Sequence, residues 1–481
     1  MLFNSFQFLA FFLIVYALYL MLDHKWQNRM LLVASYMFYG TWDWRFLFLL
    51  ATTSIIDYYC GIKIDESEEP NHRRLFLITS LTANLGMLGF FKYYNFFSGS
   101  LQALLLFLGV PVDMRFLHII LPLGISFYTF QSMSYVIDVY RKDFKPTKDL
   151  FSFLLFVSFF PHLVAGPIMR ARTLLMQVFS EREITLQRFY EGSFLIFWGI
   201  FQKMFVADNL ARIVDPLFAN KPPYNGSEVL IALYAFTFQV FCDFAGYSNM
   251  ARGLGKLMGF ELAVNFRNPL LSTNPVEFWN RWHISLSTWF RDYVYGSLRR
   301  AKGNSLLNYR NIAITWTLVG LWHGAAWTFV IWGAYWAFLL IVYSMMKPLL
   351  KLFPSPKDQV ASAAWLMVRM FFFFNLSALA GLLFRAVSLK QIGDLMSALI
   401  NNFKFSPAFA QTSIYFLFFI SFLMLMEIFQ YVKNDQLTML GWPRTGKAAF
   451  IIAAICLVLY VTIFGRTANI GEGQAFIYFQ F

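Results

Sequence analysis

The feature that most limits how this chain can fold is a set of apolar runs that are too long for a soluble core. Residues 2–22 contain no charged side chain, and the first charge is Asp23. About 20 mostly apolar residues suffice for a helix to cross a hydrocarbon core roughly 30 Å thick, and this run meets that length. The run at 312–346 is long enough for two helices, or for one long helix with a break. Other strongly apolar runs lie at residues 151–168, 414–426 and 448–464.

Composition agrees, because 58% of the residues are hydrophobic and only 14% are charged, against about 25% charged in soluble domains. We count about 11 or 12 apolar segments of spanning or near-spanning length. The sequence therefore predicts an all-α, polytopic integral membrane protein in contact with a lipid bilayer, with about 11 or 12 transmembrane or re-entrant helices. We expect a single membrane domain over residues 1–481, with N-terminal helices at 1–150, a functional core at 151–346 and C-terminal helices at 347–481.

The first apolar run also has the length of a secretory signal. No basic region precedes it, however, and no small-residue cleavage site follows it, only Asp23-His24-Lys25-Trp26. We interpret it as a retained helix.

The net charge is +13, which in a membrane protein indicates topology and lipid contact rather than nucleic-acid binding. Basic loops tend to be cytoplasmic. The basic residues directly after the first run therefore predict an external N-terminus, and the dense basic stretch at 281–310 is expected in the cytoplasm. The three cysteines lie in or beside apolar runs without metal or redox spacing, so we expect neither a disulfide nor a metal site.

Residues 265–310 are too polar to span a membrane and too aromatic for a flexible linker. Asn274 or Thr273 is suited to cap a helix that starts at Pro275, and Glu277 then falls in its first turn. Trp282, Leu286 and Trp289 recur at helical spacing. The segment predicts interfacial or partly buried helices.

His323 is the sharpest single candidate for chemistry. Apart from tyrosines, it is the only titratable side chain between Arg310 and Lys347, and ionisable groups within membrane segments usually face a cavity or a partner. Gly320 and Gly324 flank it. Two interpretations stay open from position alone: a catalytic histidine, or a neutral histidine hydrogen-bonded between helices that pack along a glycine seam.

Two further polar side chains are candidates. His283 lies among polar neighbours, so an ordinary interfacial histidine is as good an interpretation as a second catalytic group. Asp243 lies within an apolar run and is suited to line a cavity or to orient another side chain. The chain has no G-x-S-x-G, Walker A or H-E-x-x-H motif.

Taken together, several segments resemble the membrane-bound O-acyltransferases, and most closely their alginate O-acetyltransferase-like branch. WNRWHISLSTWFRDYVY at 279–295 resembles the family's signature segment, and LWHGAAWTFVIWGAYW at 321–336 resembles its histidine segment. Supporting matches lie at residues 121–141, 159–170, 242–260 and 476–481.

The resemblance implies an acyltransferase in which His323 is the catalytic histidine and His283 the second catalytic position. It implies a ring of tilted helices around a central funnel that opens to the cytosol. It also implies that acetyl-CoA is the acyl donor, with no bound cofactor, and that a periplasmic acetyltransferase partner modifies the final polysaccharide. The expected location is the bacterial cytoplasmic (inner) membrane.

The basic stretch suits an anionic, phosphorylated donor, with Arg281 and Arg291 in contact with it. His283 or Asn280 would then stabilise the oxyanion. His323 would act as a general base or carry the acyl group as an acyl-imidazole. The remaining residues expected to bind donor or substrate are Trp282, Ser285, Asp292, Trp322 and Asp243.

Two alternatives remain at this point. One is transfer of a D-alanyl group from a carrier protein. The other is a non-enzymatic transport or scaffold subunit of a polysaccharide export complex, in which His323 would tolerate replacement by Asn or Gln.

Overall fold

The apolar runs fold into helices in the computed structural model, which describes residues 1–299, 305–350, 352, 356 and 358–464. The described residues contain no strand, which confirms the predicted all-α class. Seven helices in these ranges are long and apolar enough to cross a membrane, so the chain is a multi-pass membrane protein. The larger number expected from the sequence, about 11 or 12, also includes shorter and re-entrant segments. The basic residues at 300 and 302 and the motif at 476–481 lie outside the described residues. The seven helices are Arg45–Glu66, Pro70–Phe107, Leu186–Ala219, Gly226–Leu257, Trp327–Leu350, Gln359–Arg385 and Pro407–Lys433.

The described residues group into two compact units. The first contains Met1–Ser193 and Met250–Ala263, and the second contains Phe194–Asn249 and Val264–Phe481. Two of the unit boundaries fall inside helices, α10 (Leu186–Ile200) and α12 (Gly226–Leu257). The division expected at residues 150 and 346 stays a prediction.

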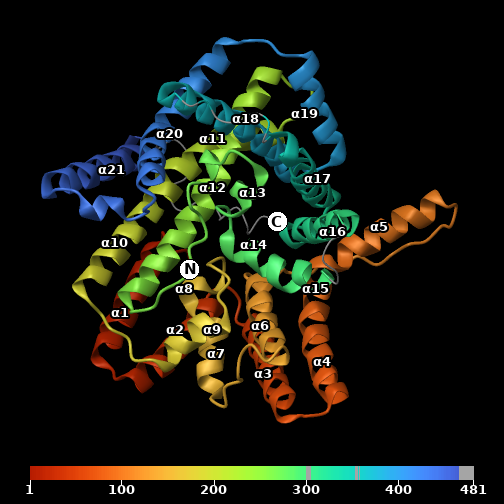
Figure 1. The fold of residues 1–481 in the computed structure, drawn as a ribbon, viewed down its shortest axis with the longest axis vertical. Helices are drawn as coiled ribbons and strands as arrows, with labels where there is room; N and C mark the ends of the chain where they lie inside the picture. Colours follow the sequence, from red (N-terminus) through yellow and green to blue (C-terminus); the bar gives the residue numbers. More distant parts are fainter. Residues whose placement is uncertain (300–304, 351, 353–355, 357, 465–481) are drawn as a thin grey trace. The chain divides into compact units, whose positions relative to one another are not determined.

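In the first unit, α3 and α4 lie side by side, and α5 leads away from the end of α4 (Figure 1). A π-helical turn, Gly89–Tyr93, joins α4 to α5. The Asp57 carboxylate on α3 accepts hydrogen bonds from Ser80 Oγ and Asn84 Nδ2 on α4, at 2.5 and 2.9 Å. The helices of this unit before α10 are α1 (Phe6–Met21), α2 (His24–Gly40), α3 (Arg45–Glu66), α4 (Pro70–Leu88), α5 (Tyr94–Phe107), α6 (Ile125–Tyr140), α7 (Leu150–Ser158), α8 (Phe160–Leu163) and α9 (Ala171–Phe179).

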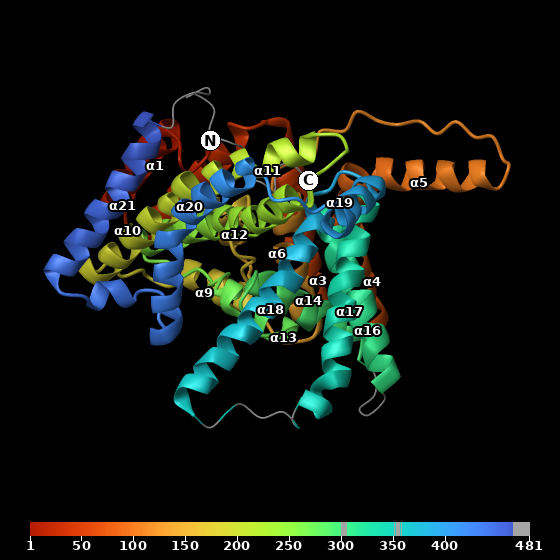
Figure 2. The ribbon, with the colours of Figure 1, turned by 90° about the horizontal axis from the view of Figure 1, so that it is seen from above.

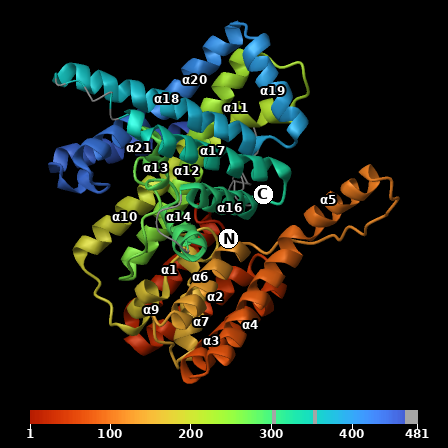
Figure 3. The ribbon, with the colours of Figure 1, turned by 45° about the vertical axis from the view of Figure 1, so that its right-hand side comes forward.

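The second unit contains every candidate site residue. In it α16 packs along α17, and α17 also contacts α18 (Figures 2 and 3). Besides the parts of α10 and α12 that it includes, its α-helices are α11 (Asp208–Ala219), α13 (Pro275–Trp279), α14 (Ile284–Phe290), α15 (Gly296–Leu298), α16 (Ser305–His323), α17 (Trp327–Leu350), α18 (Gln359–Arg385), α19 (Leu389–Asn401), α20 (Pro407–Lys433) and α21 (Arg444–Phe464). Short π or 3-10 turns lie at Phe201–Ala207, Pro269–Leu271, Arg291–Tyr295 and Thr438–Gly441.

The apolar run at 312–346 forms two helices, one of the two forms expected for it. α16 ends at His323 and α17 begins at Trp327. Glycines allow the two backbones to touch. A Cβ on Gly320 would lie 2.2 Å from the carbonyl oxygen of Phe329, and one on Gly333 would lie 2.3 Å from that of Trp316. This seam fixes the position of His323 relative to α17.

The polar segment begins with the expected cap. The Asn274 side chain accepts a hydrogen bond from the Glu277 backbone N–H at 2.9 Å, and Pro275 opens α13. The helix does not continue through Trp282, however. His283 adopts a left-handed backbone with φ of 42°, and α14 starts after it. Trp282 therefore lies outside the helix that carries Leu286 and Trp289, although all three side chains are buried.

Candidate active site

His323 lies at the C-terminal end of α16 and is only 3% exposed. Aromatic rings surround its imidazole. The ring centroids of Trp332, Trp322 and Phe384 lie 4.8, 4.9 and 5.3 Å from that of His323, each in an edge-to-face arrangement. Trp332 comes from α17 and Phe384 from α18, so three helices fix this side chain in place.

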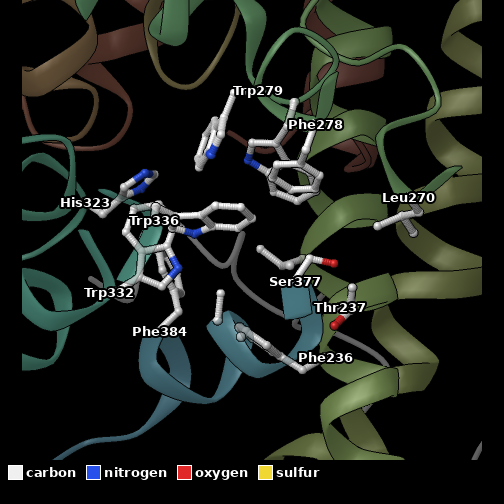
Figure 4. Close-up of a pocket in the computed structure, with 14 residues that line it drawn as sticks. Phe236, Thr237, Leu270, Phe278, Trp279, His323, Trp332, Trp336, Ser377 and Phe384 are labelled. Carbon is white, nitrogen blue, oxygen red and sulfur yellow. The ribbon is translucent and has the colours of Figure 1, made fainter. Parts of the chain in front are cut away.

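His323 lines a pocket in the second unit. α12, α13, α16, α17 and α18 all contribute to its walls. Figure 4 shows His323, Trp332 and Phe384 together on one side of this space and Leu270 and Thr237 on the other. Among the described residues, no carboxylate and no cationic Lys or Arg belongs to the lining. The lining residues are Phe236, Thr237, Val240, Leu270, Phe278, Trp279, Trp282, His323, Trp332, Trp336, Ser377, Ala380, Gly381 and Phe384.

His283 is fully buried beside the pocket but does not line it. Its ring lies 4.6 Å from that of Phe244 and 5.8 Å from that of Trp322. Burial lowers the pKa of His283 to about 3, because the charged imidazolium loses its hydration. Trp322 thus contacts both candidate histidines. The structure brings the two together around one indole, although 40 positions separate them in the chain.

Other candidates are engaged with their own neighbours. Asp243 forms an ion pair with Lys203, whose Nζ lies 2.6 Å from the Asp243 carboxylate and 2.9 Å from that of Asp208. Ser285 donates to the Asn265 side-chain oxygen at 2.6 Å. Neither Asp243 nor Ser285 lines the pocket. Among the predicted donor-binding or substrate-binding residues, only Trp282 does.

The basic residues and Asn280 lie away from the pocket lining as well. Arg281 pairs with Glu277 at 2.8 Å, and its guanidinium lies over the Tyr431 ring. Arg291 pairs with Asp292, also at 2.8 Å. Asn280 is exposed. Their roles in donor binding and oxyanion stabilisation stay predictions.

The aromatic wall is what sequence reasoning missed. Trp332 and Trp336 lie one helical turn apart in the histidine segment. This spacing places both on one face of a helix and could have indicated that they share a wall. Phe236 and Phe384 belong to α12 and α18, far apart in the chain, and nothing in their local sequence sets them apart from other core phenylalanines. Among the described residues, no group of three or more His, Cys, Asp or Glu side chains is placed to hold a metal ion.

Comparison with known proteins decides the family. Residues 145–385 match the model of the membrane-bound O-acyltransferase family. That range includes both histidines and every residue of the pocket lining. The chain belongs to the membrane-bound O-acyltransferase family. As a member it is an acyltransferase, and the resemblance seen in its motifs is confirmed.

Three relatives show the kinds of protein to which this membrane-bound O-acyltransferase is similar. It is 45% identical over 337 residues to the probable alginate O-acetylase of Azotobacter vinelandii, covering 70% of this chain and 67% of the relative. It is 31% identical over 396 residues to the peptidoglycan O-acetyltransferase of Helicobacter pylori, covering 77% and 73%. It is 31% identical over 237 residues to the teichoic acid D-alanyltransferase of Bacillus subtilis, covering 47% and 59%. The match spans about two thirds of the length of the alginate O-acetylases.

Proposed function

We propose that this membrane-bound O-acyltransferase takes an acetyl group from acetyl-CoA on the cytosolic side. The acetyl group then passes outward for O-acetylation of an extracellular or periplasmic polysaccharide. The protein would act in the bacterial inner membrane together with a periplasmic acetyltransferase. The observation that carries the proposal is the position of His323. Of the described residues that line the pocket, it alone has a side chain that can act as a base near neutral pH.

The chemistry follows from that position. The imidazole of His323 takes the proton of an acceptor hydroxyl as the hydroxyl oxygen attacks the thioester carbonyl. A C–O bond forms, the C–S bond breaks, and the proton passes on to the departing thiolate. Because aromatic rings form the walls, competing water finds few partners in the pocket. His283 remains a predicted second catalytic residue, and its contact with Trp322 connects it to the ring packed on His323.

Two observations favour acetyl over D-alanyl as the transferred group. The alginate O-acetylase relatives are more similar to this chain and cover more of it than the D-alanyltransferases do. An acetyl group is uncharged and needs no counter-ion, whereas a D-alanyl ester carries an ammonium group. The described lining of the pocket offers aromatic ring faces to such an ammonium group, but it offers no carboxylate.

The test compares the wild-type protein with His323→Ala and His323→Gln at matched membrane abundance. The acetyl content of the extracellular polysaccharide is measured in each strain. Loss of acetylation in both variants supports the proposal, because glutamine keeps hydrogen bonding but is not a base. Full acetylation by His323→Gln would contradict a catalytic histidine. A wild-type strain whose polysaccharide carries D-alanyl esters and no acetyl groups would point to the other cargo.

A further inference from the structure

Two tryptophan indoles in the wall of the His323 pocket stand out because their N–H groups make no hydrogen bond to the described residues. Trp279 on α13 is 5% exposed and Trp336 on α17 is 2% exposed. Both Nε1–H groups are buried from solvent, and neither has a hydrogen-bond partner among the described residues. The two rings lie 5.0 Å apart at 78°. Figure 4 shows both beside His323.

Buried donors without partners are uncommon, because a donor that leaves water without gaining an acceptor loses free energy. The two hydroxyl groups of the lining, by contrast, already donate hydrogen bonds to backbone carbonyls. Thr237 Oγ1 donates to the Leu233 carbonyl at 2.9 Å, and Ser377 Oγ donates to the Phe374 carbonyl at 2.8 Å. The two indoles are therefore donors that the fold itself leaves available in this pocket.

Acyl transfer needs such donors. When a hydroxyl attacks a thioester carbonyl, the carbonyl oxygen becomes an oxyanion, and fixed N–H groups in a water-excluded site stabilise it. We propose that the indole N–H groups of Trp279 and Trp336 donate hydrogen bonds to the acyl carbonyl oxygen and to the oxyanion that develops on it. This inference rests on the proposed acyl transfer at His323, and it assigns the oxyanion role to residues other than Asn280 and His283.

The assignment is consistent with how the two rings are held. Trp279 packs against Trp316 at 4.2 Å, and Trp336 stacks on Phe278 at 4.9 Å and 10°. Neither ring has room to turn away without disturbing these contacts. Donors that are fixed before the reaction need no reorganisation as charge develops.

The first experiment uses full-length protein in membrane vesicles that contain its partner and polysaccharide acceptor. Acetyl transfer from acetyl-CoA is measured for Trp279→Phe, Trp336→Phe and the control Trp198→Phe. Trp198 is a buried tryptophan of the same unit that does not line this pocket. Each pocket variant is expected to lose about 10²–10³-fold in kcat with little change in KM, whereas Trp198→Phe keeps both.

A second variant separates hydrogen bonding from ring shape. Replacing Trp279 or Trp336 by 3-benzothienylalanine keeps the bicyclic ring but puts sulfur in place of N–H. The same loss of kcat is expected, at an unchanged melting temperature. In a His323→Ala background, the infrared C=O stretch of bound [1-¹³C]acetyl-CoA should move to higher wavenumber when either N–H is removed.

The outcomes distinguish the two proposals. If wild-type vesicles transfer acetyl and the benzothienyl proteins keep the wild-type kcat and carbonyl frequency, the oxyanion assignment is wrong. The indole N–H groups would then serve only packing against neighbouring rings. If wild-type vesicles transfer no acetyl at all, the proposed function itself fails.

Discussion

Lys203 Nζ lies 2.6 Å from a carboxylate oxygen of Asp243, and both side chains are buried. Removing one partner of a buried pair leaves the other charge without compensation. Lys203→Met is therefore expected to cost about 3–5 kcal/mol of stability, since it leaves Asp243 and Asp208 without their shared cation. Asp243→Asn should cost less, because Asp208 still pairs with Lys203. Unfolding of the purified protein in one detergent measures both.

The matched control for that pair is Lys390→Met. Lys390 pairs with Asp394 one turn away on the surface of α19, where both groups reach solvent, so little change in stability is expected. Asp243 was also predicted to bind substrate. An Asp243→Asn protein that unfolds like the wild type but has a raised KM would support binding and contradict the stabilising role.

The glycine seam between α16 and α17 gives a second prediction. Gly333→Ala places a methyl group where a Cβ would lie 2.3 Å from the Trp316 carbonyl oxygen. The helices must separate, which displaces His323 from Trp332 and Trp336. We expect loss of most acetyl transfer and a lower unfolding temperature. Gly393→Ala in α19 is the control, because nothing lies within 4 Å of its added Cβ. Equal activity of the two variants would refute the role of the seam.

Phe384 sets the third prediction, on the size of the acyl group. Its ring lies 5.3 Å from His323 and 5.4 Å from Trp332. Phe384→Ala enlarges the pocket beside the reacting group. The rate with propionyl-CoA relative to acetyl-CoA should rise about 10-fold or more, since one methylene is worth about 1–3 kcal/mol in a hydrophobic site.

Phe419→Ala is the matched control for that measurement. It removes a similarly buried phenylalanine of α20 that does not line the pocket, so the propionyl-to-acetyl ratio should stay at the wild-type value. An unchanged ratio in Phe384→Ala would show that this wall does not limit acyl length.

His283 gives a prediction on pH. Burial holds its pKa at about 3 in the folded protein, against an ordinary value of 6.5. Between these values the unfolded chain binds a proton that the folded chain does not, so stability falls as pH drops below 6.5 and is unaffected above it. The wild type should lose up to about 1.4 kcal/mol per pH unit more than His283→Gln in this window. Denaturant unfolding at pH 4.5 to 7.5 tests this, and parallel curves would contradict it.

Local patterns predicted the parts of this structure that local forces determine. The break between α16 and α17 and the Asn274 cap both follow from short stretches of sequence. Partners could not be read in the same way. The local sequence shows that Asp243 is a polar residue within an apolar run, but it does not show that Lys203 pairs with it. The Phe384 and Phe236 walls come from distant helices, and their packing depends on the whole unit.

The seam described above also bears on biogenesis. α17 is apolar enough to cross a bilayer by itself, whereas α16 is not among the seven such helices of the described chain. The two helices nevertheless touch backbone to backbone at Gly320 and Gly333. We therefore expect α16, which carries His323, to settle in the membrane together with α17, the helix that the ribosome makes after it.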